Sequence, residues 1–363
     1  MVVIDCDTHL IQRADDSDVR ALMGKPYSDD GYAVFPGTGW DATPCGQTGS
    51  SEWDTQSQLT AMDQEGIEIS VLMPTQALLV SQIPKAGLPT GFPRQIRDKN
   101  LAAHYCRAYN NLVASKCAES PRLKAVGIAP FQDVAAAVAE IRRAVKELGL
   151  IGIVVSSLGL TEHLGSPTFW PIYDELQKLN MPLVIHNLSH QVPVGQRYPD
   201  SFLFQDTVGG SMETLHAFTG LMYGGIPEQF PALRIGFFDI GAGWIPYMLE
   251  RMDKDFTSHG AEQAPLLKRS PSAYVKAGNW YYSTTGDEGT LPYVLDCIGD
   301  EVVVFGSRYP DADSLFPRAV SNVQTREDIS EESKRKILSE NAQRLFGMQQ
   351  VGAATQFGEE AVR

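Results

Sequence analysis

Eight short apolar segments alternate with segments of helical spacing along this chain, and this alternation constrains the fold more than any other feature. It is typical of parallel strands joined by helical crossovers. Eight such units favour an α/β fold closed into a (β/α)8 TIM-type barrel over an open doubly wound sheet, and no G-x-G-x-x-G or Walker motif favours the open sheet. The expected strands span residues 2–4, 67–73, 124–130, 152–155, 182–185, 234–238, 280–283 and 302–305. The expected helices span residues 56–65, 97–115, 133–148, 168–179, 212–223, 244–253, 291–298 and 331–346.

The length of 363 residues is within the range of a single barrel. Residues 1–348 are therefore assigned to one domain, and the tail at 349–363 is expected to be loose. Two polar stretches, near residues 12–57 and 191–210, contain no long periodic run. We expect both to be insertions over the C-terminal face of the barrel, as lids or contact surfaces.

The charge and cysteine content exclude several classes of protein. The formal net charge of −14 argues against a surface for nucleic acid or anionic membrane, because both require basic patches. The five cysteines are scattered and form no C-x-x-C pair, which favours free thiols in a reducing compartment. No signal peptide or apolar run of membrane-spanning length is present, so the expectation is a cytoplasmic protein.

Three polar residues follow the first apolar segment at alternate positions: Asp5, Asp7 and His9. In an extended strand every second side chain points to the same face. Asp7 and His9 could therefore reach one metal ion together, with Asp5 beside them if the extension continues. Oxygen and imidazole ligands suit Zn, Mn or Fe. A polar turn with an Asp cap after the strand would explain the same residues.

Polar residues also end other predicted strands, and in a (β/α)8 barrel these ends form the active site. Each has a structural alternative: a hydrogen-bonded core histidine for His186, a helix cap for Asp239, and a turn for the residues after Pro310. The predicted metal ligands are Asp5, Asp7, His9, His186 and Asp239. The candidates for a second metal or for its surroundings are His190, His216 and Asp313, and those for chemistry are Arg308 and Asp311.

Four motifs together resemble the amidohydrolase-related family, in the branch of aminocarboxymuconate-semialdehyde decarboxylase and the resorcylate-type decarboxylases. They are D-x-D-x-H at the first strand, residues 62–79 at the second, the G-x-G-W-x-P-x-x-L-E-R-x-D pattern within 239–253, and F-G-S-R-Y-P-D-A-D at 305–313. The resemblance runs from Val2 to Met348. It implies a metal-dependent barrel enzyme that is often a dimer.

The resemblance also implies roles for single residues. Asp7 and His9 match the metal pair of the first strand, and an acidic residue at the position of Asp7 is a known variation of the usual His. His186 matches the metal-binding His of the fifth strand. Asp239 falls at or next to a family His on strand six. The implied cofactor is a divalent metal, with Zn as the first expectation and Mn or Fe as alternatives.

Arg308 is the departure from the family pattern. It stands where the family carries an Asp that binds metal and moves protons, and a guanidinium can do neither, because it accepts no hydrogen bond and stays protonated. Three explanations remain open. Another carboxylate could replace the lost ligand while Arg308 binds an anionic substrate; the chain could be an altered subunit paired with a related active chain; or the metal chemistry could differ.

Two functional hypotheses follow. The first is a metal-dependent hydrolase or carbon–carbon lyase, decarboxylase-like, that acts on a small carboxylated or carbonyl substrate, with Arg308 holding a carboxylate and Asp311 as the general acid. The second is a non-heme dimetal oxygenase or N-hydroxylase subunit with iron or manganese, or an altered partner subunit. The expected assembly is a homodimer or a hetero-oligomer with a related chain.

Overall fold

The computed structural model describes residues 1–11, 17–29, 53–75, 77–80, 99–156, 160, 162–187, 206–311 and 314–348. Within them the strands run parallel in the order of the sequence, from β1 to β3 and from β4 to β9. The strands are β1 (Ile4–Leu10), β2 (Ile69–Pro74), β3 (Leu123–Ala125), β4 (Gly127–Ile128), β5 (Ile153–Val155), β6 (Leu183–Ile185), β7 (Ile235–Phe237), β8 (Trp280–Thr284) and β9 (Val303–Phe305).

The two runs of strands join into one closed barrel, which confirms the predicted fold class. The third predicted strand is interrupted at Val126, the one residue between β3 and β4, whose N–H donates to Leu72 O of β2 at 3.3 Å. On the other side of this strand, the N–H of Ile151, shortly before β5, donates to Ala125 O of β3 at 3.0 Å. At the opposite seam the backbone N–H of Arg308, after β9, donates to Asp7 O of β1 at 2.8 Å. Gly306 permits this approach, since a Cβ there would lie only 2.6 Å from Cβ of Asp7.

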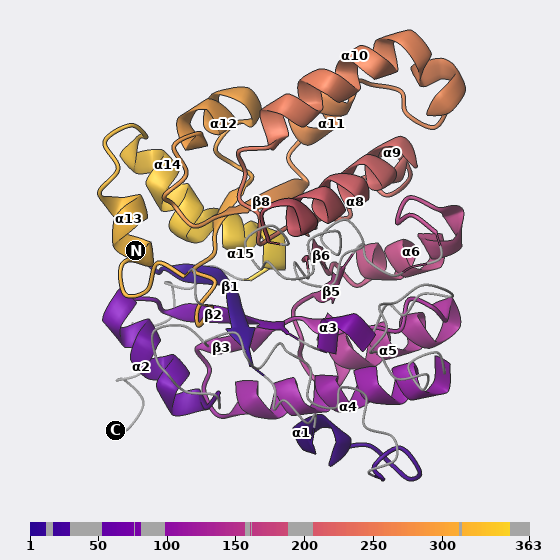
Figure 1. Ribbon diagram of the computed structural model, residues 1–363, viewed down its shortest axis with the longest axis vertical. Helices are drawn as coiled ribbons and strands as arrows, with labels where there is room; N and C mark the ends of the chain where they lie inside the picture. The colour runs from indigo at the N-terminus through magenta and orange to yellow at the C-terminus, as the bar shows by residue number, and fades with distance from the viewer. Residues whose placement is uncertain are drawn as a thin grey trace, which may run out of the picture.

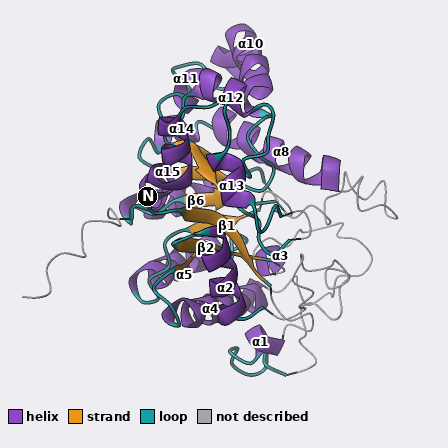
Figure 2. Cartoon of the chain, turned by 90° about the vertical axis from the view of Figure 1, so that its left-hand side faces the viewer, coloured by secondary structure: helices purple, strands orange, loops and turns teal. Residues whose placement is uncertain are grey.

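Helices surround the strands, with α4 and α5 on one side of the barrel and α8 to α12 on the other (Figures 1 and 2). The α-helices are α1 (Ser17–Arg20), α2 (Thr55–Glu65), α3 (Ala77–Val80), α4 (Lys99–Ala118), α5 (Val134–Lys146), α6 (Trp170–Lys178), α8 (Ser211–Tyr223), α9 (Ile226–Gln229), α10 (Ile245–Gln263), α11 (Pro271–Val275), α12 (Leu291–Ile298), α13 (Ala319–Gln324), α14 (Glu331–Arg335) and α15 (Asn341–Phe346). Short 3-10 and π turns complete them: η4 (Pro167–Phe169), η6 (Asp206–Gly210) and η7 (Lys336–Glu340).

Local sequence explains where several helices begin and end. Asp133 caps α5, as predicted, because its side chain accepts from the N–H of Ala136 at 3.0 Å. Asp54 caps α2 in the same way, and Gly66 ends that helix with φ of 71°. The α10 helix continues ten residues past the predicted end at 253, through a segment whose side chains are mostly exposed. Apolar periodicity is a weak guide to the end of such a helix.

The first strand differs from its prediction, and the difference matters for the site. It was expected to end at Ile4, yet β1 runs to Leu10 with every residue buried. Polar side chains are tolerated inside it because they are paired within the barrel. The pairing with β2 shifts between Asp5 and Thr8, as at a β-bulge.

The predicted insertions lie largely outside the described residues, as does the tail at 349–363. Of the stretch 12–57 the structure describes 17–29, which includes α1, and 53–57 at the start of α2; of the stretch 191–210 it describes the turn η6. None of the helices that it describes has the length and apolar character needed to cross a lipid bilayer.

Candidate metal centre

Three buried side chains converge at the carboxyl end of the barrel: Asp7 and His9 from β1, and His186 directly after β6. His9 Nε2 lies 3.1 Å from His186 Nε2 and 3.6 Å from Asp7 Oδ1, and His186 Nε2 lies 3.3 Å from the same oxygen. One ligand atom from each residue thus falls within 4.8 Å of the others. This spacing suits a single metal ion bound by one oxygen and two nitrogens.

The second nitrogen of each histidine faces an acceptor. His186 Nδ1 lies 2.8 Å from the backbone oxygen of Asn187, and His9 Nδ1 lies 3.2 Å from Oδ2 of Asp311. An acceptor at Nδ1 favours the tautomer whose Nε2 lone pair is free. Both rings therefore present Nε2 to the shared point, and each has an acceptor beside its Nδ1, as metal-binding histidines commonly do.

The charges of the three residues fit a cation at this point. Burial opposes the ionised form of Asp7, but the two histidines and Arg308 outweigh it and lower the pKa of the carboxyl. Burial likewise opposes protonation of His9, but Asp311 and Asp7 raise the pKa of its imidazole to about 9, and Asp7 and Asp239 raise the pKa of His186. Among the described residues no donor reaches buried Oδ2 of Asp7, which leaves an orphaned oxygen for a metal.

A second group of charges lies beside this cluster and comes from the ends of β7 and β9. Arg308 Nε is 2.7 Å from Oδ1 of Asp239, and its Nη2 is 3.7 Å from Oδ2 of Asp311. The other oxygen of Asp239 accepts a hydrogen bond from the side-chain amide of Asn187. Asp239 is thus bound to Arg308 and Asn187, and its side chain caps no helix, because α10 begins at Ile245 without a side-chain cap.

Asp5, predicted as a ligand, is used elsewhere. Its Oδ1 accepts from the backbone N–H of Ser307 at 2.9 Å and from that of Asp7 at 3.1 Å. Burial raises the pKa of this carboxyl to about 6. Asp5 therefore ties β1 to the segment after β9 and lies outside the group of Asp7, His9 and His186. The pairing of β1 with β2 is irregular between Asp5 and Thr8, so simple alternation does not extend across this point.

A family model with the description Amidohydrolase matches residues 4–348. The chain belongs to the amidohydrolase family. Among curated relatives, the 2-amino-3-carboxymuconate-6-semialdehyde decarboxylase of Dictyostelium discoideum is 26% identical over 301 residues, covering 82% of this chain and 78% of the relative. The gamma-resorcylate decarboxylase of Rhodococcus jostii is 29% identical over 339 residues, covering 88% and 94%.

The fold of this amidohydrolase is shared with solved decarboxylases. A 5-carboxyvanillate decarboxylase from Novosphingobium aromaticivorans, solved with manganese and 4-hydroxy-3-methoxy-5-nitrobenzoic acid, superposes with a TM-score of 0.73 at 21% identity and covers 96% of each chain. The named activities of the curated relatives agree with the predicted class of carbon–carbon lyase. The spacing of Asp7, His9 and His186 supports a divalent metal. The solved neighbour contains manganese and not zinc, the first expectation for this chain.

The structure places two other residues of the predicted site beside the three-residue group. Asp239 lies outside the three-residue group and is paired with Arg308. Asp311 was predicted as the general acid, but it lies against His9, and the charges of His9 and Arg308 overcome its desolvation and lower its pKa. A carboxyl that is ionised at neutral pH is a poor proton donor, so the geometry favours a supporting role.

The predicted second metal site is not assembled by the described residues. His216, a candidate for this site, is exposed on α8. His190 and Asp313 lie outside the described residues. The part of the chain that the structure describes contains one group with metal-ligand spacing, that of Asp7, His9 and His186.

Sequence reasoning missed Asn187, whose backbone oxygen orients His186 and whose amide binds Asp239. Its only signal was its place directly after a strand that ends on a candidate ligand. Ser307 was missed too, because its contribution is a backbone N–H, which no side-chain pattern reveals.

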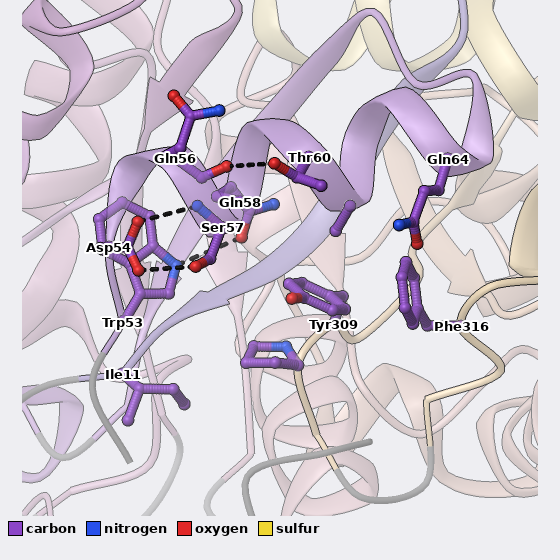
Figure 3. Close-up of a pocket in the computed structure, with 12 residues that line it drawn as sticks. Ile11, Trp53, Asp54, Gln56, Ser57, Gln58, Thr60, Gln64, Tyr309 and Phe316 are labelled. Atoms are coloured by element: carbon purple, nitrogen blue, oxygen red, sulfur yellow. Dashed lines mark hydrogen bonds between the residues drawn. The ribbon is translucent and has the colours of Figure 1, made fainter. Parts of the chain in front are cut away.

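A cavity of about 320 Å³ lies between α2 and the residues Tyr309, Pro310 and Phe316 (Figure 3). Trp53, Tyr309 and Phe316 supply its rings, whereas Asp7, His9 and His186 are absent from the described lining. Tyr309, which lines the cavity, is connected to the metal centre by one backbone hydrogen bond, from the N–H of His9 to Tyr309 O at 2.7 Å. We assign it no part in the chemistry.

Proposed function

We propose that this chain is a divalent-metal-dependent carboxy-lyase that decarboxylates a small aromatic or unsaturated carboxylic acid. The observation that carries the proposal is the convergence of Asp7, His9 and His186 on one point. Each histidine has an acceptor oxygen beside its Nδ1, on the side of the ring away from that point. The named activities of the relatives supply the reaction type, since they include decarboxylases of resorcylate and of aminocarboxymuconate semialdehyde.

Asp7, His9 and His186 would hold the metal, and its presence is compatible with Arg308. Three carboxylates, those of Asp7, Asp239 and Asp311, and one guanidinium leave an excess of two negative charges when the histidines are neutral. That excess equals the charge of one divalent ion. We propose Mn²⁺, which accepts mixed oxygen and imidazole ligands. When bound, such an ion would polarise a substrate oxygen.

Arg308 would bind and orient the substrate through its positive charge at the mouth of the barrel. Its side chain is 17% exposed, and its guanidinium lies beside the carboxylates of Asp239 and Asp311. A guanidinium recognises a carboxylate well because its N–H groups match the two oxygens. In this proposal Arg308 would give a chain without the eighth-strand Asp a means to select an anionic substrate.

The test is the activity and metal content of purified protein, with 2,6-dihydroxybenzoate and 5-carboxyvanillate as first substrates. His186→Ala should lose bound metal and lower decarboxylation at least about 100-fold, because a ligand is lost. His259→Ala, at an exposed position of α10, is the matched control and should keep both. Retained metal and turnover in His186→Ala would refute the proposal.

Two other outcomes would point elsewhere. Oxygen consumption with reductant and about two iron or manganese ions per chain would replace the lyase with a dimetal oxygenase. Absence of bound metal, with no Mn²⁺ uptake, would indicate an altered subunit that needs a related chain.

A further inference from the structure

Arg308 stands between two carboxylates, and each of them leads to one of the metal-site histidines. Its Nη2 is 3.7 Å from Oδ2 of Asp311, and that oxygen is 3.2 Å from Nδ1 of His9. On the other side its Nε is 2.7 Å from Oδ1 of Asp239. One guanidinium is therefore close to the groups that orient both imidazole rings.

The second connection runs through Asn187. The side-chain amide of Asn187 donates to Asp239, and the backbone oxygen of the same residue lies 2.8 Å from Nδ1 of His186. Arg308 also touches the third ligand residue directly, because its backbone N–H donates to Asp7 O at 2.8 Å. All three residues of the candidate metal centre are thus linked to Arg308 by at most two intervening groups.

The backbone at this pair is unusual in a way that indicates constraint. Arg308 has φ of 57° and Asp239 has φ of 83°. Residues other than glycine rarely adopt this left-handed backbone conformation, because it is strained for them. Such backbone strain persists where the surrounding structure requires it. Here it turns two side chains from non-adjacent strand ends, after β7 and after β9, toward each other.

We propose that Arg308 is a positioning residue of the metal centre: it holds Asp311 against His9 and Asp239 against Asn187, and so fixes the orientation of both histidines. This inference rests on the proposed metal site. Arg308 would then support the metal ligands from the position where the family pattern carries a metal-binding carboxylate.

The sign of one mutational effect separates this role from simple proximity. A cation beside a divalent metal repels it, so removal of the charge alone should strengthen metal binding. Loss of a residue that orients the ligands should weaken binding, because supporting hydrogen bonds commonly contribute about 10- to 100-fold to metal affinity. The two effects oppose each other, and the direction of the measured change identifies the larger one.

The experiment measures Mn²⁺ affinity from the EPR signal of free Mn²⁺ in titrations of native protein and variants. Arg308→Gln should weaken binding about 10-fold or more and alter the spectrum of bound Mn²⁺, and Arg308→Lys should restore part of the affinity. The control is Arg251→Gln, which removes an exposed ion pair with Asp255 on α10 and should change neither quantity. Thermal melting of the metal-free variants checks their folding.

A double-mutant cycle with Asp239→Asn tests the pairing. If Arg308 acts through Asp239, the double variant should bind Mn²⁺ within about twofold of the weaker single variant, whereas independent effects would multiply. Unchanged or tighter binding in Arg308→Gln would overturn the inference, and so would multiplicative effects in the cycle. Failure of the proposed function looks different: native protein would not bind Mn²⁺, or His186→Ala would bind it equally well. Should Arg308→Gln not fold, Arg308→Lys against Asp239→Asn provides the same comparison.

Discussion

The two halves of the barrel mouth carry different sets of charged and polar side chains. On the β1 and β6 side, Asp7, His9 and His186 bring an oxygen and two nitrogens directly to one point. On the β7 and β9 side, Asp239 and Arg308 form an ion pair that is linked to the two histidines through Asn187 and Asp311. The backbone N–H of Arg308 also donates to Asp7 O. In our proposal one half holds a cation, and the other positions the groups that do so and presents a positive charge. If this is right, the neighbours of Arg308 compensate for the departure from the family pattern.

The largest expected effect is on the ligand side. Asp7→Asn removes the carboxylate charge from the metal group and should weaken Mn²⁺ binding more than about 100-fold, because the amide is a poorer ligand and two nearby histidines lose their counter-charge. Metal titration of the purified variant measures this. Asp255→Asn, at an exposed position of α10, should leave binding unchanged. Equal affinity of Asp7→Asn and native protein would place the metal elsewhere.

The pH dependence of metal binding tests the coupling between the two halves. The pKa of His9 is about 9 and that of His186 is raised, so at pH 7 the metal-free protein carries protons that Mn²⁺ must displace. Affinity should therefore rise from pH 7 to pH 9, by up to about tenfold per pH unit for each proton released. Calorimetry in buffers of different ionisation enthalpy counts those protons.

Asp311→Asn sharpens this measurement. The variant removes the largest influence that raises the pKa of His9, so its affinity should depend less steeply on pH. A slope equal to that of the native protein would mean that Asp311 does not act on His9.

A smaller effect concerns Asp5, which ties the two halves together at the β1–β9 seam. Its folded-state pKa of about 6 lies above the ordinary value of 3.8, so the folded protein binds this proton more tightly than the unfolded chain. Stability should fall as pH rises from about 4 to 6, by on the order of 2–3 kcal/mol from this group. Asp5→Asn should remove that fall, which urea unfolding of the metal-free protein at pH 4 and pH 7 would detect. The same pH dependence of the unfolding free energy in native protein and Asp5→Asn would contradict this prediction.

The smallest effect lies outside the mouth. Asp133→Ala removes the cap of α5 and should cost about 1 kcal/mol of stability, without changing Mn²⁺ affinity. Denaturant unfolding together with metal titration distinguishes the two readouts. A change in Mn²⁺ affinity would show that α5 and the metal centre are coupled more closely than the contacts indicate.

The sequence predicted those parts of the fold that depend on local pattern. Alternation of apolar strands and helices was enough for the barrel, and alternation within β1 brought Asp7 and His9 to one face. His186 followed from its place at the end of a strand. These predictions succeeded because strand periodicity and the position of strand ends in a barrel are properties of short segments.

The other half of the site depends on contacts between distant residues. The pairing of Arg308 with Asp239 and the use of Asp5 as a tie to Ser307 join residues far apart in the chain, and the irregular pairing after Asp5 breaks the simple alternation. No spacing within one segment encodes such a contact. The ionised state of Asp311 is also a product of its neighbours, His9 and Arg308, and not of its own sequence context.

The most direct test of the account is the metal content of native protein and His186→Ala after purification and titration with Mn²⁺. We predict about one divalent metal per native chain and a clear loss in the variant, because His186 supplies one of three converging ligands. Equal metal content in both proteins, or none in the native chain after titration, would contradict the claim that Asp7, His9 and His186 form a metal centre beside Arg308.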